Sequence, residues 1–562
     1  MYETFLSLLK QVLGLVVTRP NLLSSYRVVR DGGRHLFMSS TSNPVDEGWL
    51  TTFNGGIIKQ GVQLALFNGG LRGVVATAPT SSTAPVVLVK ADVALEVTNN
   101  RPPTPFADFA PQDFWSSCMW DQRLGLKLLH ELKNISATSK MGWISQLPES
   151  FNTPIHWSSQ DIDFAQYTPL NLKVTAQRDS WSSFYRRWQG VTSPRFRDLV
   201  SQADMYRVLE CCNSRAFSGA YEGSSPQDRK ALLVFTVLLA VVWPLLQLSS
   251  VEQSVGLGVT VGLSVVLRDF FLSNFANLKR YVLCPYVDMF NHRSDARSDV
   301  AFNYFSNQFE LCVLKDYQPG EQVFISYGKP SNDRLLQFYG FVEAGNPNDL
   351  YDFGSTLPEV LLTYGDAVAK QVQFPASPAS RLQFIAAAVR NTDVMSRKAG
   401  ARSEMDMVQV QSSSLASGGA GGGGAAMENI NLRYYRTPIG GSAVGISAHY
   451  DDVSVRCLRL FFASETEFAD VLRAWKLPPD SKAFSESASV NLDCVSQPLS
   501  ASTEAKIDAC LRAMANEELR SKPTSLEADE KQARTALTEA QSLALEFRIE
   551  KKRLLVEASN NS

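Results

Sequence analysis

Two short segments of the sequence carry the residues best suited to chemistry. The first, 284–292, ends in Asn291 and His292, and the second, 320–328, contains Tyr327 next to its last residue. The Tyr327 hydroxyl could accept a hydrogen bond from an incoming amine, but a phenol is a poor base at neutral pH. The Asn291 amide both donates and accepts, which suits the edge of a base such as adenine. Taken alone, the same residues could be a buried tyrosine, a turn asparagine and a core histidine.

Strands are needed to position both segments. Apolar residues predict strands at 301–305 and 309–314, joined by the polar turn 306–308. A turn is predicted at Pro319-Gly320, followed by a third strand, 322–327, that delivers Tyr327 to its end. Upstream, strands are predicted at 62–67, 71–77, 86–89 and 93–97, and residues 113–215 are predicted to be helical.

The order of these motifs is long and specific. Asn291-His292, then Gly-Glu-Gln-Val-Phe-Ile-Ser-Tyr-Gly at 320–328, then Asn-x-x-Leu-Leu-x-x-Tyr-Gly-Phe at 332–341, resembles the catalytic half of a SET domain of the Rubisco large-subunit methyltransferase family. The resemblance implies an α+β fold: a SET-domain β-fold with a pseudoknot and a large helical insertion, followed by an all-α C-terminal domain. It also implies a protein N-methyltransferase that uses S-adenosyl-L-methionine.

The resemblance also implies the roles of individual residues. Tyr327 would be catalytic. The cofactor would be bound by Gly73, Arg215, Asn291, His292 and Tyr339, and the substrate by Arg215, Asp288, Tyr327 and Phe341. No metal site is expected, because no second ligand lies at a usable spacing from His292.

Two positions depart from the family pattern. Leu71 stands at the first glycine of a G-x-G turn whose second glycine is Gly73. Either the turn is shifted and uses Gly70, or the cofactor contact differs, or this region is a plain hairpin. Glycine would suit a ligand-binding turn because it tolerates positive φ and lets backbone N–H groups approach a ligand. Gly219 stands where some relatives carry a second basic residue beyond Arg215.

The chemistry that the resemblance implies is methyl transfer from a sulfonium to an amine. The amine must be neutral, and lysine has an ordinary pKa near 10.4. A narrow apolar channel and the positive charge of the cofactor both disfavour the ammonium form. Alignment of the two reactants then removes an entropic cost of several kcal/mol.

Domain organisation follows from shifts in composition. Residues 1–45 are predicted to be an N-terminal helix and loop, and 46–350 the SET domain with a helical insertion at about 101–280. Residues 351–562 are predicted to be a helical substrate-binding domain interrupted by a Gly-rich loop at 398–428. Within it, the segment 499–504, which contains Ser500, should cap a helix that runs through Met514. A capping box at 524–527 should open a single long helix that contains Leu537 and Leu554.

The most unusual stretch is the apolar segment 231–267. Residues 231–248 carry no charge, 251–267 are nearly as apolar, and basic residues flank both runs. This layout fits a helical hairpin with both basic ends on one side of a membrane. Pro244 and the shortness of both runs favour the alternative, a pair of buried or dimer-forming helices. Both interpretations remain open.

Composition limits the partners. The chain has 54 basic and 56 acidic residues and a net charge of −2, so nothing points to nucleic acid. Its eight cysteines show no ligand spacing and are interpreted as free thiols in a reducing compartment, the cytoplasm or a plastid. The expected partner is a protein that presents a lysine or a histidine, since one branch of the family methylates histidine. The alternative is a catalytically inactive SET-like scaffold that only binds a protein.

Overall fold

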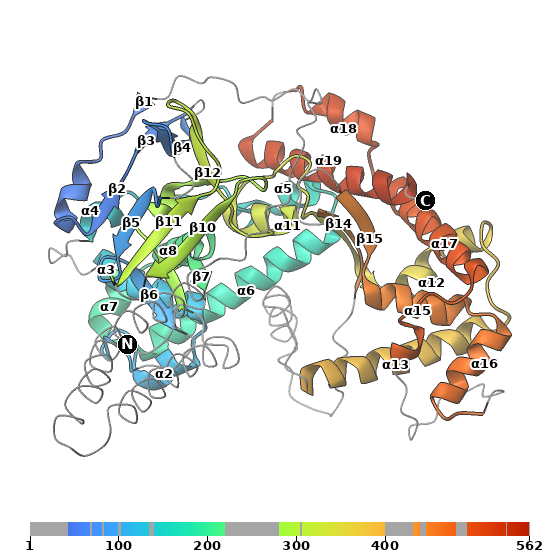
Figure 1. Cartoon of the computed structure of the whole chain (residues 1–562). Coiled ribbons are helices and arrows are strands. Elements are labelled where there is room, and N and C mark those ends of the chain that lie inside the picture. Colours follow the sequence, from blue (N-terminus) through green and yellow to red (C-terminus); the bar gives the residue numbers. More distant parts are fainter. Residues whose placement is uncertain are drawn as a thin grey trace, which may run out of the picture. The chain divides into compact units, whose positions relative to one another are not determined.

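The computed structural model describes most of the chain between residues 43 and 560 (Figure 1). The described ranges are 43–67, 70–80, 84–98, 103–133, 140–219, 280–303, 306–398, 431–438, 446–478, 492–535 and 537–560. The predicted N-terminal helix before residue 43, the apolar segment 231–267 and nearly all of the Gly-rich loop 398–428 lie outside them. No helix within the described ranges is long and apolar enough to cross a membrane.

The strands around the predicted site form two sheets in the described part of the chain. One has the order β1-β3-β4-β12-β9, and the other has the order β10-β11-β5-β2. Their bounds are β1 Asn43–Pro44, β2 Ile57–Lys59, β3 Val62–Leu66, β4 Arg72–Ala76, β5 Val87–Lys90, β9 Asn291–His292, β10 Ser298–Asn303, β11 Gln308–Val313 and β12 Gln322–Ile325. The predicted hairpins β3–β4 and β10–β11 are both confirmed.

The two predicted chemical segments meet through a parallel strand pair. In β9 and β12, Asn291 lies opposite Phe324 and His292 lies opposite Ile325. The hairpin β10–β11 separates these strands in the sequence but belongs to the other sheet, so the chain crosses over between them. On its other side β12 pairs with β4 in antiparallel fashion. The end of β12, which leads to Tyr327, is thereby placed beside Asn291 and His292.

A third sheet and a set of helices complete this part of the molecule. The sheet has the order β6-β8-β7, with bounds β6 Leu95–Thr98, β7 Phe217–Gly219 and β8 Arg280–Leu283. The helices are η1 Gly48–Phe53, α2 Gln112–Ser117, α3 Trp120–Lys133, α4 Met141–Ile144, η3 Pro154–His156, α5 Ser159–Phe164, α6 Thr168–Val191, α7 Pro194–Leu199, α8 Gln202–Arg215, η4 Val287–Met289, α11 Asn332–Arg334 and the π-helical η5 Leu335–Tyr339. The predicted helical character of 113–215 is confirmed.

Helix α8 carries Arg215 at its last position. It begins with a capping box, in which the Ser201 hydroxyl accepts from the Asp204 N–H and the Asp204 carboxylate accepts from the Ser201 N–H. It packs against α3, where a Cβ on Gly125 would lie 3.2 Å from the Leu209 side chain, so glycine permits the close approach. Capping at one end and packing along the length fix the direction in which Arg215 leaves the helix.

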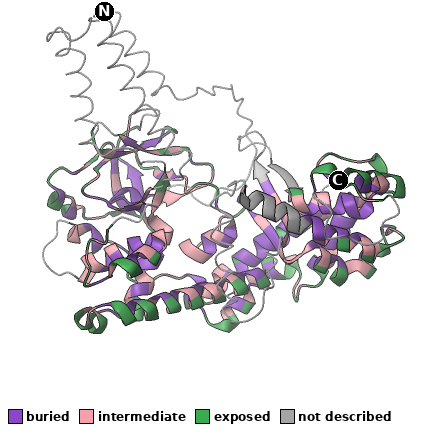
Figure 2. Cartoon of the chain, turned by 90° about the horizontal axis from the view of Figure 1, so that it is seen from below, coloured by how far each residue is buried: buried purple, intermediate pink, exposed green. Residues whose placement is uncertain are grey.

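Apolar side chains gather in two large cores within the described residues. One lies between the β-sheets and helices α2, α3, α4 and α8. The other belongs mainly to the C-terminal region, but it also contains Trp157, Tyr167 and Leu336. Figure 2 shows buried residues in the strands and in many of the helices, and exposed residues at the outer surface. The predicted domain boundary at 350 stays a prediction, and the second core crosses it.

The C-terminal region is mostly helical but is not all-α. Its helices are α12 Leu357–Ala369, α13 Pro378–Lys398, α15 Asp452–Phe462, α16 Glu465–Ala474, η7 Asp493–Val495, α17 Ala501–Arg520, α18 Leu526–Gln532 and α19 Glu539–Asn560. A three-stranded antiparallel sheet, β13 Leu350–Thr356, β14 Asn431–Pro438 and β15 Ile446–Tyr450, contradicts the all-α expectation. Its middle strand β14 pairs with β15, which follows it closely in the sequence, and with β13, which lies far before it, and the long-range pairing with β13 leaves little local signal.

The single long helix predicted from 524 onward is also wrong. Ser525, not Thr524, caps α18 by accepting from the Ala528 N–H, and a second helix begins after Thr538, which accepts from the Gln541 N–H. The two helices turn back on each other because buried Asp529 of α18 binds Arg548 and Lys552 of α19. Ser500 caps α17 as predicted.

Candidate active site

The turn that leads into β9 is strained and firmly held. Tyr286 has φ +72°, a conformation that non-glycine residues rarely adopt. Its ring is fully buried, and its hydroxyl donates to Glu47 Oε1 at 2.8 Å. The next residues form η4, which directs Asp288 into the core. Strain of this kind persists only where the surroundings impose it, and it clusters at functional sites.

Tyr327 follows β12 and turns back toward β9. Its hydroxyl donates to the Phe290 carbonyl at 2.6 Å, and its backbone N–H donates to His292 Nδ1 at 3.0 Å. Burial raises the pKa of the phenol, and the nearby Arg215 charge only partly opposes this. The phenol is therefore protonated at neutral pH, as the sequence argument expects. Its oxygen donates to Phe290 and keeps lone pairs that can accept a further hydrogen bond.

Tyr327 and three other ring-bearing side chains form a closed group of four. Tyr327 stacks on His292 with ring centroids 4.9 Å apart and on Tyr339 at 5.1 Å, and Phe341 contacts both His292 and Tyr339 at 6.3 Å. Gly340, between Tyr339 and Phe341, allows this grouping. Its φ of +72° ends η5, and a Cβ there would lie 3.1 Å from the Asn152 carbonyl oxygen. The structure thus brings together four of the predicted residues.

A charged cluster lies beside the phenol. Arg215 Nη1 donates to the Asp288 carbonyl at 2.6 Å and lies 3.7 Å from the Asp288 carboxylate. That carboxylate also accepts from Trp143 Nε1 at 3.3 Å. Burial raises the pKa of Asp288, with Arg215 and Arg72 acting in the opposite direction. The predicted pair Arg215 and Asp288 is therefore in direct contact.

Gly73 lies inside β4, and steric crowding explains why it is glycine. A Cβ at this position would lie 2.6 Å from Gln322 Nε2 and 2.7 Å from Asn291 Nδ2. Asn291 Nδ2 donates to the Arg72 carbonyl at 3.0 Å, so this amide ties β9 to β4. The positive φ of the hairpin belongs instead to Gly70, at +80°. A positive φ at Gly73 is therefore not the reason for glycine there, and the positive φ at Gly70 belongs to the turn of the β3–β4 hairpin.

Sequence reasoning did not select two residues of this site. Arg72 donates to the Gln146 carbonyl at 2.7 Å, and its pKa is lowered by burial and by the neighbouring Arg215 charge. Glu343 approaches the ring of His292, with 3.6 Å between Oε2 and Nε2. Each stands within two residues of a selected residue, Gly73 and Phe341, but nothing local distinguishes either from a surface charge.

Several buried polar atoms of the site have no hydrogen-bond partner among the described residues. They are Arg215 Nε, Asp288 Oδ1, His292 Nε2, Gln322 Nε2 and Glu343 Oε2. An unpaired buried polar atom is costly, so a cluster of them indicates a place where a ligand makes the missing bonds. The donors and acceptors suit a ligand with a carboxylate, an ammonium and a heterocyclic edge. No cluster of possible metal ligands occurs within the described ranges.

Comparison with solved structures decides the fold. The chain superposes on the SET domain of LSMT bound to lysine and AdoHcy with a TM-score of 0.52 and 15% identity, over 91% of this chain and 89% of that one. It superposes on Rubisco LSMT bound to AdoMet with a TM-score of 0.51 and 14% identity, over 91% of this chain and 90% of that one. The chain has the fold of a SET domain. At this identity, the structural likeness establishes the fold alone.

Sequence similarity to curated proteins covers a shorter stretch of the chain. SET domain-containing protein 4 of Homo sapiens is 33% identical over 90 residues, 16% of this chain and 20% of that protein. Ribosomal lysine N-methyltransferase 4 of Saccharomyces cerevisiae is 35% identical over 83 residues, 14% of this chain and 16% of that protein. The chain thus matches about a fifth or less of the length of these relatives. No family model matches it.

Proposed function

We propose that this SET-domain protein is an S-adenosylmethionine-dependent protein-lysine N-methyltransferase. The observation that carries the proposal is the Tyr327 phenol. It is held by the Phe290 carbonyl at 2.6 Å, stacked between His292 and Tyr339, and placed beside the Arg215–Asp288 contact. The names of the relatives support the activity, since one is a ribosomal lysine N-methyltransferase.

The cofactor would be held around the unsatisfied atoms Arg215 Nε, Asp288 Oδ1 and Gln322 Nε2, whereas His292 Nε2 and Glu343 Oε2 face each other. When bound, S-adenosylmethionine supplies a methyl group on a positively charged sulfur. Arg215 and Arg72 could pair with a carboxylate, for which a guanidinium is well shaped. Asn291, His292 and Tyr339 would flank the heterocycle, and the absence of a side chain at Gly73 would leave room for the Asn291 amide. These assignments follow the predicted set, with Arg72 added from the structure.

The same residues would prepare the amine. Two guanidinium groups near the phenol disfavour a further positive charge, so the neutral amine form of a bound lysine is favoured over the ammonium form. Because the Tyr327 proton is engaged by Phe290, the phenol oxygen can accept from the amine N–H. This contact would aim the nitrogen lone pair at the methyl carbon. The N–C bond would form as the C–S bond breaks, and the amine would then lose a proton.

The protein substrate would be recognised outside this small site. Helix α19 of the C-terminal region contacts the segment that follows η5 through Lys551 and Glu550. The predicted role of this region in substrate positioning is part of the proposal, and so is the choice of lysine rather than histidine. Phe341 and Asp288 would contact the target side chain.

The first experiment combines cofactor binding with product analysis. The purified full chain is titrated with S-adenosylmethionine by calorimetry and then incubated with methyl-labelled cofactor and total cell protein. The labelled protein is hydrolysed, and methyllysine is separated from methylhistidine. Label in methyllysine supports the proposal. Label only in methylhistidine rejects the lysine assignment, and an absence of cofactor binding rejects the enzyme in favour of a binding scaffold.

Tyr327→Phe tests the residue that carries the proposal. The variant keeps the aromatic ring but loses the hydroxyl, so turnover should fall on the order of 10²-fold, as for other groups that act only in the transition state. Cofactor affinity should stay within about twofold of the wild type, because the ring contacts are retained. Unchanged turnover would remove the role given to Tyr327.

A further inference from the structure

The protonation of His292 can be deduced from its neighbours. Its Nδ1 accepts the backbone N–H of Tyr327 at 3.0 Å, so Nδ1 carries a lone pair rather than a proton. A neutral imidazole has one donor nitrogen and one acceptor nitrogen. The proton of His292 must therefore be on Nε2. The opposite tautomer would place two N–H groups against each other and push the Tyr327 backbone away.

Glu343 faces the other nitrogen. Its Oε2 lies 3.6 Å from His292 Nε2, slightly beyond hydrogen-bond length, and the two side chains are 17% and 1% exposed. Neither atom has a hydrogen-bond partner among the described residues. Burial favours the neutral acid, but His292 and the Ser294 N–H outweigh it and lower the pKa of Glu343. An ionised carboxylate at this position stabilises the proton on Nε2.

The orientation of Glu343 is fixed at several points. Its Oε1 accepts from the Ser294 N–H at 2.9 Å, which leaves Oε2 to face the histidine. Its backbone N–H donates to Asn332 Oδ1 at 2.9 Å, and its carbonyl accepts from Asn332 Nδ2 at 3.0 Å. The side chain and both backbone groups of Glu343 are thus held at once.

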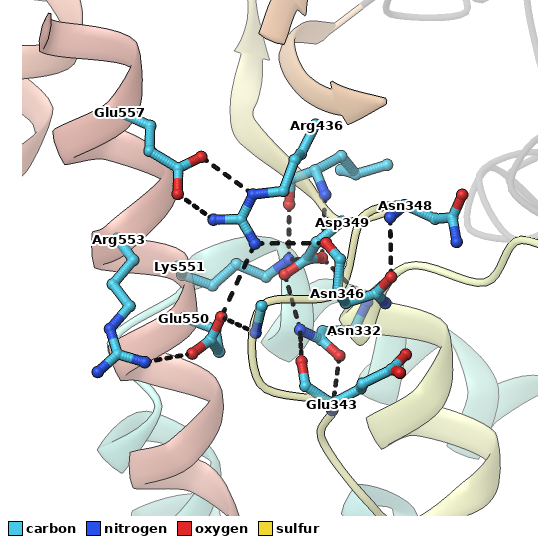
Figure 3. Close-up of polar contacts among 12 residues, drawn as sticks. Asn332, Glu343, Asn346, Asn348, Asp349, Arg436, Glu550, Lys551, Arg553 and Glu557 are labelled. Atoms are coloured by element: carbon cyan, nitrogen blue, oxygen red, sulfur yellow. Dashed lines mark hydrogen bonds and ion pairs between the residues drawn. The ribbon is translucent and has the colours of Figure 1, made fainter. Parts of the chain in front are cut away.

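A chain of contacts connects this arrangement to the C-terminal helix. Asn332 donates twice to the Asp349 carboxylate, at 2.9 and 2.8 Å, and Asp349 accepts from Lys551 of α19 at 2.9 Å. Figure 3 shows Lys551 and Glu550 reaching from α19 toward the loop that carries Glu343. Glu550 accepts from the Gly345 N–H at 2.9 Å, two residues beyond Glu343. The C-terminal helix therefore helps to hold the loop on which Glu343 lies.

We propose that Glu343 is a positioning residue that keeps the His292 proton on Nε2, so that Nδ1 holds the Tyr327 backbone and the phenol in place. The catalytic role of Tyr327 in this inference rests on the proposed function. The tautomer of His292 does not depend on that function, because it follows from the contacts of the two ring nitrogens. The carboxylate acts through the histidine and touches neither reactant. The network from α19 gives the C-terminal region a second task besides substrate docking: it supports the geometry of the active site.

Glu343→Gln is the decisive variant because it has nearly the same shape. Its amide oxygen must accept the Ser294 N–H, so its NH₂ group replaces Oε2 opposite His292 Nε2. A donor at this position makes Nε2 the acceptor and moves the histidine proton to Nδ1. Glu343→Asp retains the charge and is the conservative comparison. Glu149→Gln, an exposed carboxylate, is the matched control.

The readout is the tautomer, followed by turnover. Ring nitrogens of ¹⁵N-histidine-labelled protein are observed by NMR, and the chain has only five histidines, with His292→Gln giving the assignment. We expect an Nε2–H tautomer in the wild type, Glu149→Gln and Glu343→Asp, and an Nδ1–H tautomer in Glu343→Gln. Turnover of Glu343→Gln should fall about tenfold or more, with cofactor affinity nearly unchanged.

The outcomes separate this inference from the proposed function. An Nδ1–H tautomer in the wild type, or an unchanged tautomer in Glu343→Gln, overturns the inference whatever the activity. A changed tautomer with wild-type turnover overturns the positioning role. If the wild type methylates no protein at all, the proposed function fails, while the tautomer result still decides whether Glu343 sets the state of His292.

Discussion

Lys551 offers the sharpest test of how the C-terminal helix is attached. Its side chain is 3% exposed and donates to Asp333 Oδ2 at 2.5 Å, to Asp349 Oδ1 at 2.9 Å and to the Leu350 carbonyl at 2.6 Å. Burial disfavours its charge, but the two carboxylates outweigh burial and raise the pKa of Lys551. The residue is therefore a charged lysine that satisfies two buried anions from another part of the chain.

Lys551→Met removes the charge while retaining most of the volume. Asp333 would still have Lys173 at 3.1 Å, but Asp349 would be left with neutral donors only. Breaking a buried ion pair in this way costs about 3–5 kcal/mol. The pKa of Asp333 gives a consistent scale: burial raises it, but Lys173 and Lys551 lower it to about 2 from an ordinary 3.8. This difference corresponds to about 2 kcal/mol of stabilisation by charged partners.

Thermal unfolding at pH 7 measures the effect. We expect the Tm of Lys551→Met to fall by about 5–10 °C. Lys531→Met, which changes an exposed lysine of α18 in the same way, is the control and should stay within about 1 °C. Adding Asp349→Asn to Lys551→Met should recover part of the loss, because it removes the uncompensated charge. A Tm of Lys551→Met equal to that of the wild type would refute the view that this ion pair secures the helix.

Three further predictions concern the site and its support. Gly73→Ala should weaken S-adenosylmethionine binding about tenfold in calorimetry, with a stability loss of only ~1 kcal/mol, because the new Cβ displaces the flexible Asn291 side chain; equal affinity would separate Gly73 from the cofactor. Asn291→Ala should also weaken binding about tenfold, since it loses the amide that bridges to β4; an unchanged dissociation constant would count against the assignment. Because the folded-state pKa of Asp333 is depressed to about 2, its stabilisation is complete above its ordinary pKa of 3.8 and is lost as the pH falls through about 2. The stability difference between wild type and Asp333→Asn should therefore shrink by about 2 kcal/mol from pH 5 to pH 2, and a constant difference would contradict it.

Local patterns in the sequence were sufficient to predict many of the strands and helices around the candidate site. The strands at 298–303, 308–313 and 322–325, the helical stretch up to Arg215 and the Ser500 cap all follow from periodicity, turn residues and capping chemistry. These signals are short-range, so they survive without tertiary information. The ordered motifs around Asn291, Tyr327 and Tyr339 selected residues that the structure brings together.

Other features depend on contacts that no local pattern reports. The sheet β13–β14–β15 joins β13 to the pair β14–β15, which lies far from it in the sequence. The break between α18 and α19 is set by the pairing of Asp529 with Arg548 and Lys552. The glycine at position 73 is required by the Asn291 and Gln322 side chains from other strands, whereas the positive φ lies at Gly70.

The sequence by itself determined which residue types could perform methyl transfer and the strand that carries Tyr327. Only the tertiary structure decided how they act together, because hydrogen bonds, ring contacts and buried ion pairs depend on distances of a few ångströms between remote segments. Arg72, Glu343 and Lys551 read as ordinary surface charges in the sequence. Folding buries Lys551, brings Arg72 beside Arg215 and sets Glu343 against His292.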